Sequence, residues 1–579
     1  MLSMSGRARS TARAARWPLV ATLLVALAAC GGGDDGAALV DAGAIDAAPP
    51  PDAAIDPSAA LFPRDRVLEV RIALPAADWA ALRAQPRPSD LSDTTCARQP
   101  TAPGYTYFRG SITIDGVTVA DVGLRKKGNL GSISSARPGL WVKANEYVSG
   151  QRLGGMEVLT LNNNHQDDTL ISQCLGYGLF RAAGLPAPRC AFAHVVVNGE
   201  DLGVYSHVES VREEMLARHF ADPTGNLYES GGDFVVGGTG GFQPKTNSSA
   251  PDCSDLTSVV TAMAAPDNQL EARLGAVVDL DQYVRFWAME VVTDHWDGYA
   301  NNQNNFFVYH DPSTDKMSFI PWGIDALFTG RQRTTRPYSV FACGSLPWRL
   351  YSAPATRARY LTALRGVLDT VWDAPTITAE IDRMQTLLGP FADPGNTGAF
   401  AERLAGTRRF VAGREAQLRA ELAAGDPVWP YAAGQASCRI DLGTITATFS
   451  TTWGTLGRFD VGSGTMSGTI AGVNVATSTV VAAAGLDAEQ KAGMQLLGRL
   501  PDGRYAVVFL VVTNPADITP STRAIDLLNV AAIMTFYDPA TDTTTGGGLI
   551  LPGTLRLTAA STVTGAPIVG SVTGTVIEL

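Results

Sequence analysis

The amino-acid composition changes after Gly425, and this change points to an architecture of more than one domain. From residue 427 onward, short runs rich in Thr, Val, Gly and Ala alternate with turn residues, as in "TITATFSTTW" and "YAVVFLVV". Period-two alternation in runs of this length predicts β-strands. At 579 residues the chain also exceeds what one hydrophobic core accommodates. We therefore expect a β-rich, sandwich-like domain at 427–579, with a barrel as the alternative arrangement.

The segment 62–426 predicts a separate α+β domain. "RVLEVRIAL" alternates like a half-buried strand, and "PAADWAALRAQ" follows with helical spacing and a proline in the first turn. Two later apolar runs, "CAFAHVVV" and "EDLGVYSHVE", are joined through Asn198 and Gly199, a pair typical of two-residue hairpin turns. Strands and helices are therefore mixed throughout this domain.

The first residues predict export. Arg7, Arg9, Arg13 and Arg16 precede the apolar run "WPLVATLLVALAAC", which is too short for an ordinary membrane span. The small residues before Cys30 resemble a bacterial lipobox, which implies a signal peptide at 1–29 and lipidation of the Cys30 thiol. A plain signal peptide that ends in Cys is the alternative.

The expected location is the cell envelope. Position 31 is Gly, so nothing there resembles an inner-membrane retention Asp, and we expect a lipid anchor in the outer-membrane bilayer. Residues 30–61 are mostly Ala, Asp, Pro and Gly and predict a disordered tether.

Charge and cysteine content exclude some functions. The formal net charge is −11 and no run of Lys or Arg is present, which argues against nucleic acid as a partner. After Cys30, six cysteines remain in an exported chain, so up to three disulfides are expected with their pairing open. Their scattered spacing does not favour zinc. They are Cys96, Cys174, Cys190, Cys253, Cys343 and Cys438.

The polar stretch "HWDGYANNQNNFF" is the main candidate site. The preceding "DLDQYVRFWAMEVVTD" has apolar residues at helical spacing, so a helix delivers Asp297 just past its end. The strands "NFFVYH" and "KMSFIPW" are joined by the turn "DPSTD". Counting outward from the turn places Asn305 opposite Trp322, which brings Asp325 back beside Asp297.

Two carboxylates with one or two carboxamides are the ligands that Mg²⁺ requires. We therefore expect Asp325 to bind a metal together with Asn305 or Asn302. An ordinary Asn-rich turn is the alternative reading of this stretch.

The segments "ADVGLRKKGNLGS", "NNNHQDDTLISQCLGYGLFRAAG", "GNLYES" and "HWDGYANNQNNFFVYHDPSTDKMSFIPWGIDALF" together resemble the spore-coat CotH kinase family. The resemblance implies a two-lobed, atypical protein-kinase-like fold. It also implies transfer of the γ-phosphoryl group of ATP to Ser/Thr hydroxyls of a protein substrate, with Mg²⁺ or Mn²⁺. In this reading Asp297 accepts the hydroxyl proton.

The resemblance also assigns residues to ATP. Lys143 would hold phosphates, and Glu209 would contact the adenine or ribose; a solvated Lys and a surface Glu are the alternatives. The turn after "LRKK" would approach the phosphates, although an ordinary hairpin turn reads the same way. The residues assigned to this turn and its flank are Arg125, Lys127, Asn129 and Ser132.

Two departures from the kinase pattern support a second hypothesis. Gln173 occupies the helix position of the Glu that pairs with the kinase lysine, and Gly323 stands where the family often has the first Asp of Pro-Trp-Asp-x-Asp. Both changes remove charge from the site. The alternative is therefore a catalytically inactive relative that serves as a surface or envelope structural or binding lipoprotein.

Overall fold

The computed structural model describes most of the chain. The described residues are 34–35, 56–85, 104–128, 132–230, 232–235, 241–248, 253–330, 336–392, 397–431, 440–477, 479–487, 491–525, 529–541 and 543–578. The predictions on the signal peptide, Cys30, Cys96, Asn129 and Cys438 lie outside these residues. In the described part, no helix is long and apolar enough to cross a membrane.

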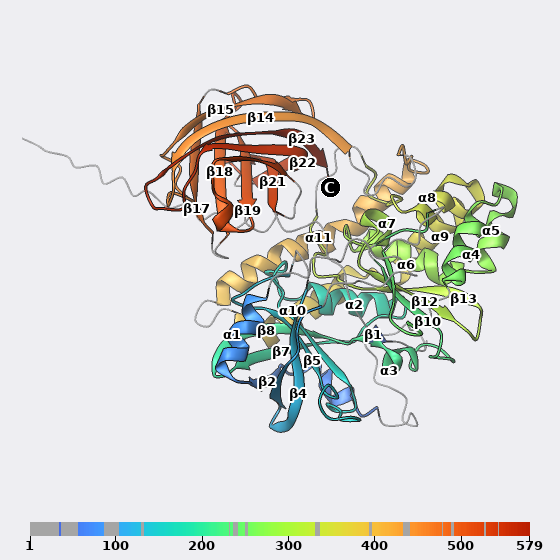
Figure 1. The fold of residues 1–579 in the computed structure, drawn as a ribbon. Helices are drawn as coiled ribbons and strands as arrows, with labels where there is room; N and C mark the ends of the chain where they lie inside the picture. Colours follow the sequence, from blue (N-terminus) through green and yellow to red (C-terminus); the bar gives the residue numbers. More distant parts are fainter. Residues whose placement is uncertain are drawn as a thin grey trace, which may run out of the picture.

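Seven strands close into a barrel in the order β2-β3-β4-β5-β6-β8-β7 (Figure 1). Their bounds are β2 (Leu68–Ala73), β3 (Phe108–Ile114), β4 (Val117–Lys127), β5 (Gly139–Lys143), β6 (Val158–Asn162), β7 (Cys190–Val197) and β8 (Glu200–Val208). The barrel core contains Leu124, Leu140 and Val142. Because side chains alternate along a strand, Arg125 and Lys127 point out of the barrel.

A helix and a buried lysine cover one end of the barrel. Helix α1 (Ala76–Ala84) follows β2. The inward-facing Lys126 donates from Nζ to the carbonyls of Arg83 and Gln85, at 3.0 and 3.1 Å. These carbonyls lie at the C-terminal end of the helix, where a cation is favourable.

A four-stranded sheet and helices form the second part of the domain. The sheet order is β11-β10-β12-β13, with β10 (Asn226–Ser230), β11 (Phe242–Pro244), β12 (Phe306–Asp311) and β13 (Lys316–Pro321). The helices are α2 (Ser172–Ala182), α3 (Glu213–Leu216), α4 (Ser254–Met263), α5 (Asp267–Gly275), α6 (Leu280–Val292), α7 (Tyr299–Asn302), α8 (Ser345–Ser352), α9 (Pro354–Thr370), α10 (Ala374–Ala392) and α11 (Thr397–Ala423). The two-residue strands β1 (Asp34–Asp35) and β9 (Val211–Arg212) pair in parallel.

The C-terminal region is one continuous ten-stranded antiparallel sheet that curls around its own core. Its strands are β14 (Ile440–Thr452), β15 (Ser463–Ile470), β16 (Val473–Asn474), β17 (Val480–Leu486), β18 (Ala492–Arg499), β19 (Tyr505–Val512), β20 (Ser521–Ile525), β21 (Val530–Asp538), β22 (Thr543–Ala559) and β23 (Pro567–Glu578). The sheet turns back on itself where Trp453, next to β14, bridges to Ala484 in β17. The strands were predicted, but a sandwich-like pair of sheets was wrong.

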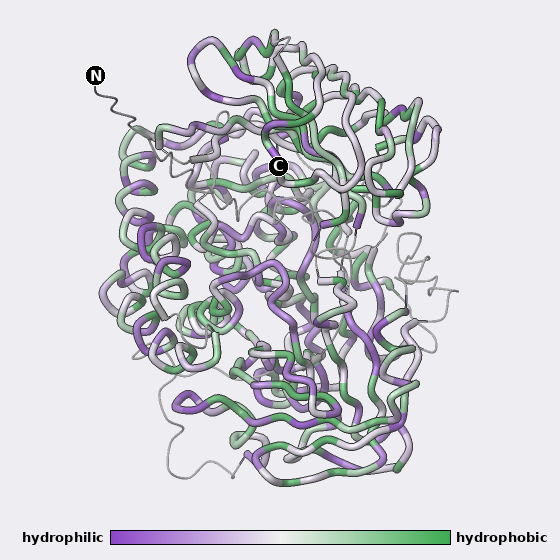
Figure 2. Tube along the Cα trace, turned by 90° about the vertical axis from the view of Figure 1, so that its left-hand side faces the viewer, coloured by the Kyte–Doolittle hydropathy of each residue, from purple (hydrophilic) through white to green (hydrophobic). Residues whose placement is uncertain are grey.

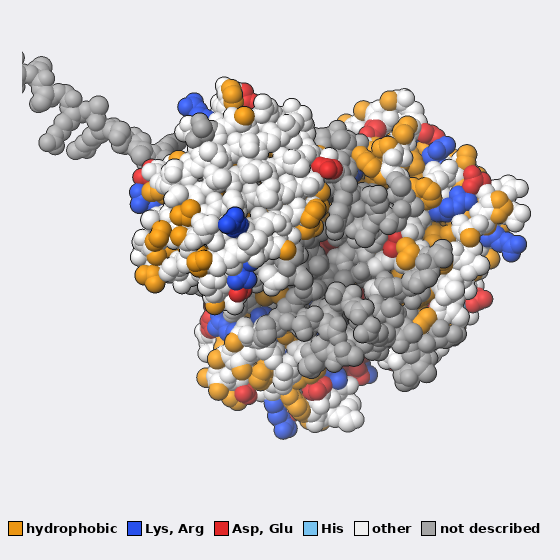
Figure 3. Space-filling view, turned by 45° about the horizontal axis from the view of Figure 1, so that its top comes forward, with side chains coloured by type: hydrophobic (Ala, Val, Ile, Leu, Met, Phe, Trp, Pro, Cys, Tyr) orange, Lys and Arg blue, Asp and Glu red, His pale blue; other side chains and the backbone are white. Residues whose placement is uncertain are grey.

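The hydropathy of the C-terminal strands agrees with a sheet that buries one face. Green and purple segments alternate along the tube in Figure 2, as expected when one face of each strand lies inside. The visible outer face in Figure 3 is mostly neutral, with scattered hydrophobic and few charged side chains. This face agrees with the Thr- and Gly-rich composition of the region.

The predicted hairpin turn is confirmed by the backbone, and two helix ends show ordinary capping geometry. Asn198 and Gly199 have φ of 50° and 86° between β7 and β8, the left-handed conformation that their hairpin turn requires. Gly184 lies just after α2 with φ of 70°. Asp279 caps α6 by accepting from the Gln282 backbone N–H at 3.1 Å. Turn chemistry therefore located these element ends correctly.

The predicted tether ends earlier than expected. Residues 56–61 are packed on the barrel, because the Asp56 carboxylate pairs with Arg189 at 2.5 Å and the Leu61 side chain is buried. The Leu61 carbonyl accepts from Nδ1 of His207 at 3.1 Å, and the Phe62 ring stacks on this histidine at 4.6 Å. Residues 56–61 thus belong to the folded part of the chain and not to the tether.

His207 makes this packing sensitive to acid. Burial lowers the pKa of His207 from 6.5 to about 3. The pKa of His207 is lower in the folded state than in the unfolded state. The stability that the neutral histidine contributes is therefore complete above pH 6.5 and is lost as pH falls toward 3. The stability advantage of wild type over His207→Gln should fall roughly tenfold in equilibrium constant per pH unit below 6.5. Urea unfolding from pH 7.5 to 4.5 measures this, and parallel pH profiles would contradict it.

Candidate functional site

Asp297 lies at the centre of a carboxamide cluster. Helix α6 is almost entirely buried, and the chain leaves it to place Asp297 with only 7% of its surface exposed. Its Oδ1 accepts from Nδ2 of Asn302 at 2.6 Å and of Asn304 at 3.2 Å. Its Oδ2 accepts from Nδ2 of Asn305 at 2.7 Å. Three amide donors therefore fix the orientation of one carboxylate.

A buried glutamate of α6 holds this loop in place. Glu290 accepts from the backbone N–H groups of Tyr299 and Ala300 at 2.7 and 2.9 Å, at the start of α7. Burial raises its pKa to about 8, against the opposing effect of these two hydrogen bonds. Gln303 and Asn305 adopt left-handed φ angles of 51° and 52°, which turn the loop back toward Asp297. The sequence analysis missed Glu290, whose signal was a charged residue on an otherwise apolar helix face.

The β12–β13 hairpin closes the site as predicted. Phe306 pairs with Pro321 and Asp311 pairs with Lys316, so the turn is centred between Ser313 and Thr314. The next pair in this register is Asn305 and Trp322, and the Trp322 backbone N–H donates to the Asn305 carbonyl at 3.2 Å. Asn305 Nδ2 also donates to the Gly323 carbonyl at 3.3 Å. Asn305 thus connects Asp297 to the segment that carries Asp325.

Asp325 interacts with Lys127 across the site. The surrounding protein raises the pKa of Asp325 to about 6, and the Lys127 ammonium opposes this rise. Desolvation lowers the pKa of Lys127 to about 8, while Asp325 and Glu229 act in the opposite direction. Both side chains are half-buried. The Lys127 ammonium also lies 5.8 Å from the centre of the Trp322 ring.

Three consecutive asparagines at the end of β6 form a second polar cluster. Lys127 donates from Nζ to Oδ1 of Asn162, and Asn162 donates to Oε1 of Gln173 at 2.6 Å. Gln173 donates to Oδ1 of Asn164 at 3.0 Å. Asn163 donates to the backbone carbonyls of Ser132 and Arg137, at 2.9 and 2.7 Å. The sequence analysis missed the role of these asparagines, although "NNN" repeats the signal of the other Asn cluster.

The predicted phosphate turn is partly described. Gly128 has φ of 103°, and a Cβ at this position would lie 2.2 Å from the Ser132 hydroxyl, so only glycine fits here. Arg125 stacks on Trp141 at 4.7 Å and donates from Nε to the Tyr107 hydroxyl at 3.2 Å. Ser132 therefore lies beside the turn, whereas Arg125 is bound to neighbouring aromatic side chains.

Lys143 is not brought to the cluster. Its ammonium pairs with Glu146 at 2.9 Å and lies 5.9 Å from the Tyr107 ring. The β4–β5 register explains this position, because Lys127 lies opposite Gly139 whereas Lys143 lies opposite Gly123. The two lysines share a face of the sheet but lie at opposite ends of the ladder. Lys127, rather than Lys143, faces Asp325.

Glu209 is also bound elsewhere. Its buried carboxylate contacts Arg189 at 2.6 Å and Arg218 at 2.5 Å. Burial alone would raise the pKa of Glu209, but the Arg218 and Arg189 guanidiniums bring it below its usual range. This ion-pair network joins Glu209 to the N-terminal segment through Arg189 and Asp56. The structure thus separates Glu209 from the cluster around Asp297.

The donor set suits a hard, oxygen-seeking cation. Carboxylate oxygens of Asp297 and Asp325 and the carboxamide oxygens of Asn302 and Asn305 are the donor types that Mg²⁺ and Mn²⁺ take. Among the described residues, no group of three or more His, Cys, Asp and Glu forms a metal cluster. Burial lowers the pKa of nearby His295 to about 4, so this side chain stays neutral at pH 7. Asp325, Asn305 and Asn302 therefore carry the donor atoms that such a cation would require.

Gly323 cannot be replaced without moving Asn305. Its φ is +55°, and a Cβ there would lie 2.4 Å from Cγ and Oδ1 of Asn305. We expect Gly323→Asp to lower stability by about 1–3 kcal/mol and to displace Asn305 from Asp297, despite restoring the acid that the family often has. Thermal unfolding measures the first effect. The double variant Gly323→Asp/Asn305→Ala should recover stability, and a Gly323→Asp protein as stable as wild type would contradict this.

Together these features define a mixed α and β protein with a β-rich C-terminal region. Residues 124–405 match the family model described as CotH kinase protein. Inner spore coat protein H of Bacillus subtilis (strain 168) is 25% identical over 254 residues, which cover 41% of this chain and 69% of that protein.

Two proteins of Rhizopus delemar are also similar to the chain. Invasin CotH7 is 24% identical over 268 residues, covering 42% of this chain and 44% of that protein. Spore coat protein homolog 1 is 22% identical over 304 residues, covering 49% of each. The chain thus spans less than half of each of these two relatives.

Proposed function

We propose that the chain is a CotH-like protein kinase that transfers the γ-phosphoryl group of ATP to Ser/Thr hydroxyls of a protein in the cell envelope. The observation that carries the proposal is the Asp297 carboxylate held by Asn302, Asn304 and Asn305. A carboxylate held in one orientation is suited to accept a hydroxyl proton as its oxygen attacks phosphorus. The neighbouring Lys127 and Asp325 supply the opposite charges that nucleotide and metal require.

Each residue of the site has a role in this proposal. Lys127 binds phosphate oxygens, because its ammonium faces the Asp325 side of the site. Mg²⁺ or Mn²⁺ would be held by Asp325 with Asn305 or Asn302, and when bound it neutralises phosphate charge. The turn at Gly128 and Ser132 approaches the phosphates through backbone N–H groups.

The proposed location is the cell surface or envelope. The relatives are named spore coat or invasin proteins, which favours an extracellular or surface protein. The lipobox-like sequence before Cys30 supports a lipid anchor in the outer membrane. The disulfide between Cys174 and Cys190, with an S–S distance of 2.03 Å, is consistent with an oxidising compartment.

The proposal is tested by phosphate transfer in vitro. The purified chain is incubated with ATP labelled in the γ-phosphate and a generic protein acceptor, with Mn²⁺, with Mg²⁺ or with EDTA. We expect labelling with either metal and none with EDTA, and a strong decrease in Asp325→Asn. The matched control is Asp315→Asn, because Asp315 is an exposed turn residue outside the site. Equal labelling by wild type and Asp325→Asn would contradict the proposal.

A second candidate function is a catalytically inactive surface-binding protein. It is favoured by Gly323 and Gln173, which leave the site with fewer carboxylates than the kinase pattern has. In that case the Asn cluster stabilises a polar core, and the C-terminal sheet is the binding surface. A wild-type chain that neither binds ATP nor transfers phosphate would favour this function.

A further inference from the structure

Helix α2 contacts the immediate neighbours of both Lys127 and Asp325. In the first turn of the helix, Oε1 of Gln173 accepts a hydrogen bond from Nδ2 of Asn162. Oδ1 of Asn162 in turn accepts a hydrogen bond from the Lys127 ammonium. One turn later, Gly176 packs against the segment of Asp325, since a Cβ there would lie 2.4 Å from Leu327 and 2.8 Å from Ile324. The same rigid helix therefore sets the positions of Lys127 and of the Asp325 segment.

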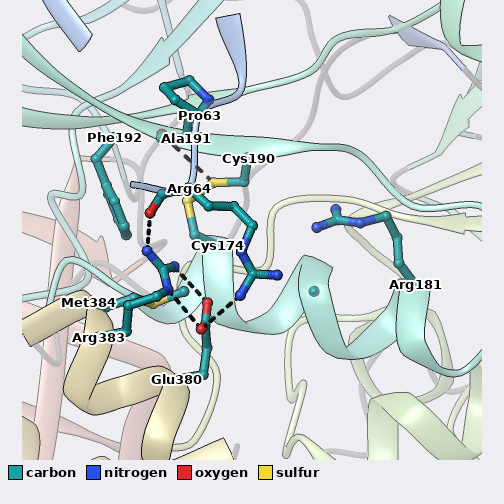
Figure 4. Close-up of a pocket in the computed structure, with 11 residues that line it drawn as sticks. Pro63, Arg64, Cys174, Arg181, Cys190, Ala191, Phe192, Glu380, Arg383 and Met384 are labelled. Atoms are coloured by element: carbon teal, nitrogen blue, oxygen red, sulfur yellow. Dashed lines mark hydrogen bonds and ion pairs between the residues drawn. A yellow bond between two sulfur atoms is a disulfide. The ribbon is translucent and has the colours of Figure 1, made fainter. Parts of the chain in front are cut away.

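Further contacts prevent α2 from shifting. Gln173 also donates to Oδ1 of Asn164, which accepts from the Ser206 hydroxyl of β8 at 2.9 Å. On the other side, Cys174 is joined to Cys190 of β7 by a disulfide (Figure 4). The helix is thus fastened to the barrel by hydrogen bonds at Gln173 and by a covalent bond at the next residue.

Helix α10 adds an ion-pair network beside this disulfide. Figure 4 shows Glu380 of α10 between Arg64 and Arg383, with the disulfide in the same small pocket. Glu380 lies 3.0 Å from Arg64 and 2.6 Å from Arg383. These contacts connect the N-terminal segment to α10 near the outer side of α2.

We propose that Asn162 and Gln173 are positioning residues that aim Lys127 at the nucleotide phosphates through a neutral hydrogen-bond relay. This inference rests on the proposed function and deepens it. In this chain the relay performs the task that an ion pair performs in ordinary kinases. A neutral relay leaves the positive charge of Lys127 free for phosphate, because no carboxylate on α2 competes for it.

The relay requires both amide groups in a defined order. Asn162 accepts from Lys127 with its oxygen, so its nitrogen is the only group that remains to donate to Gln173. Gln173 then accepts with its oxygen and donates with its nitrogen to Asn164. Replacing either amide by Leu removes the connection, while Gln173→Glu keeps the acceptor that Asn162 needs.

The test measures binding of the non-hydrolysable ATP analogue AMP-PNP with Mn²⁺ to the purified full chain by calorimetry. Gln173→Leu and Asn162→Leu are expected to weaken binding about tenfold, as for the loss of a hydrogen bond to a charged group. Gln173→Glu keeps an acceptor for Asn162 but adds a carboxylate that competes for the Lys127 ammonium, so its affinity should fall between those of wild type and Gln173→Leu. In a Lys127→Met background, Gln173→Leu should cause no further loss, because residues that act through one group are not additive.

The control separates positioning from simple destabilisation. Thr160→Val, two residues before Asn162 on β6, removes the buried hydrogen bond between Thr160 and Ser210 and is expected to lower stability without changing affinity. Wild type that binds no AMP-PNP would contradict the proposed function itself. Wild type that binds, with unchanged affinity in both Leu variants or with additive losses in the Lys127→Met background, would overturn the relay alone.

Discussion

Asp297→Asn is expected to reduce phosphate transfer by about 10²- to 10⁴-fold, the usual contribution of a positioned general base. The substitution keeps the size of the side chain but replaces an acceptor by an amide with its own N–H donors. Asn302 and Asn304 both donate to Oδ1 of Asp297, so the new side chain retains one acceptor for them. Its new amide nitrogen faces Asn305, whose carboxamide must turn to present its oxygen. The fold should therefore persist while the proton acceptor is lost.

The measurement compares initial rates of γ-phosphate transfer and AMP-PNP affinity for wild type and Asp297→Asn. We expect a lower rate with affinity changed much less, because the base acts on the acceptor hydroxyl rather than on the nucleotide. Asp315→Asn provides the control for loss of an exposed carboxylate. A transfer rate in Asp297→Asn within a few fold of wild type would exclude Asp297 as the base.

The pairing of Asn305 with Trp322 was predictable because hairpin geometry is symmetrical. Counting equal numbers of residues from the turn placed Asn305 opposite Trp322, and the structure confirms that register. The resemblance to the CotH family is likewise supported by the match over residues 124–405. Local turn chemistry and strand pairing thus determined which part of the chain meets Asp297.

The alternation of side chains along a strand could not predict which of Lys143 and Lys127 lies at the Asn cluster. Period-two patterns show which residues share a face of a sheet, and both lysines share one. Which end of the ladder faces the Asn cluster depends on the β4–β5 register and on the turn between them. Lys127 also donates to Asn162 and lowers the pKa of Asp325, both of which are distant in sequence, and no local pattern encodes these interactions.

Long-range contacts also explain the other differences. The sequence predicts that Glu209 binds nucleotide, but in the structure Arg189 and Arg218 form ion pairs with it. Residues 56–61 have a tether-like composition, yet the Asp56–Arg189 pair and the buried Leu61 fix them. In the C-terminal region, alternation predicts strands but not how a sheet closes, so a curled single sheet and a sandwich have similar sequences.

Lys127→Met is expected to weaken AMP-PNP binding and phosphate transfer by about 10- to 100-fold, whereas Lys143→Met should change both by less than about twofold. The difference follows from position, since Lys143 pairs with Glu146 at a half-exposed site and Lys127 faces Asp325. Lys127→Met also removes the cation that favours the charged form of Asp325, so a lower unfolding temperature is expected as well.

The two methionine variants form a matched pair, because both remove one ammonium from the same face of the β4–β5 ladder. Any effect of lower positive charge on long-range attraction of ATP is therefore common to both, and only the local contact differs. Titration at low and high salt separates these contributions, since screening weakens the long-range part first. An equal loss of affinity in both variants at high salt would show that Lys127 has no special contact with phosphate. A larger loss in Lys143→Met would instead return the phosphate-binding role to Lys143, against the geometry of the strand pairing.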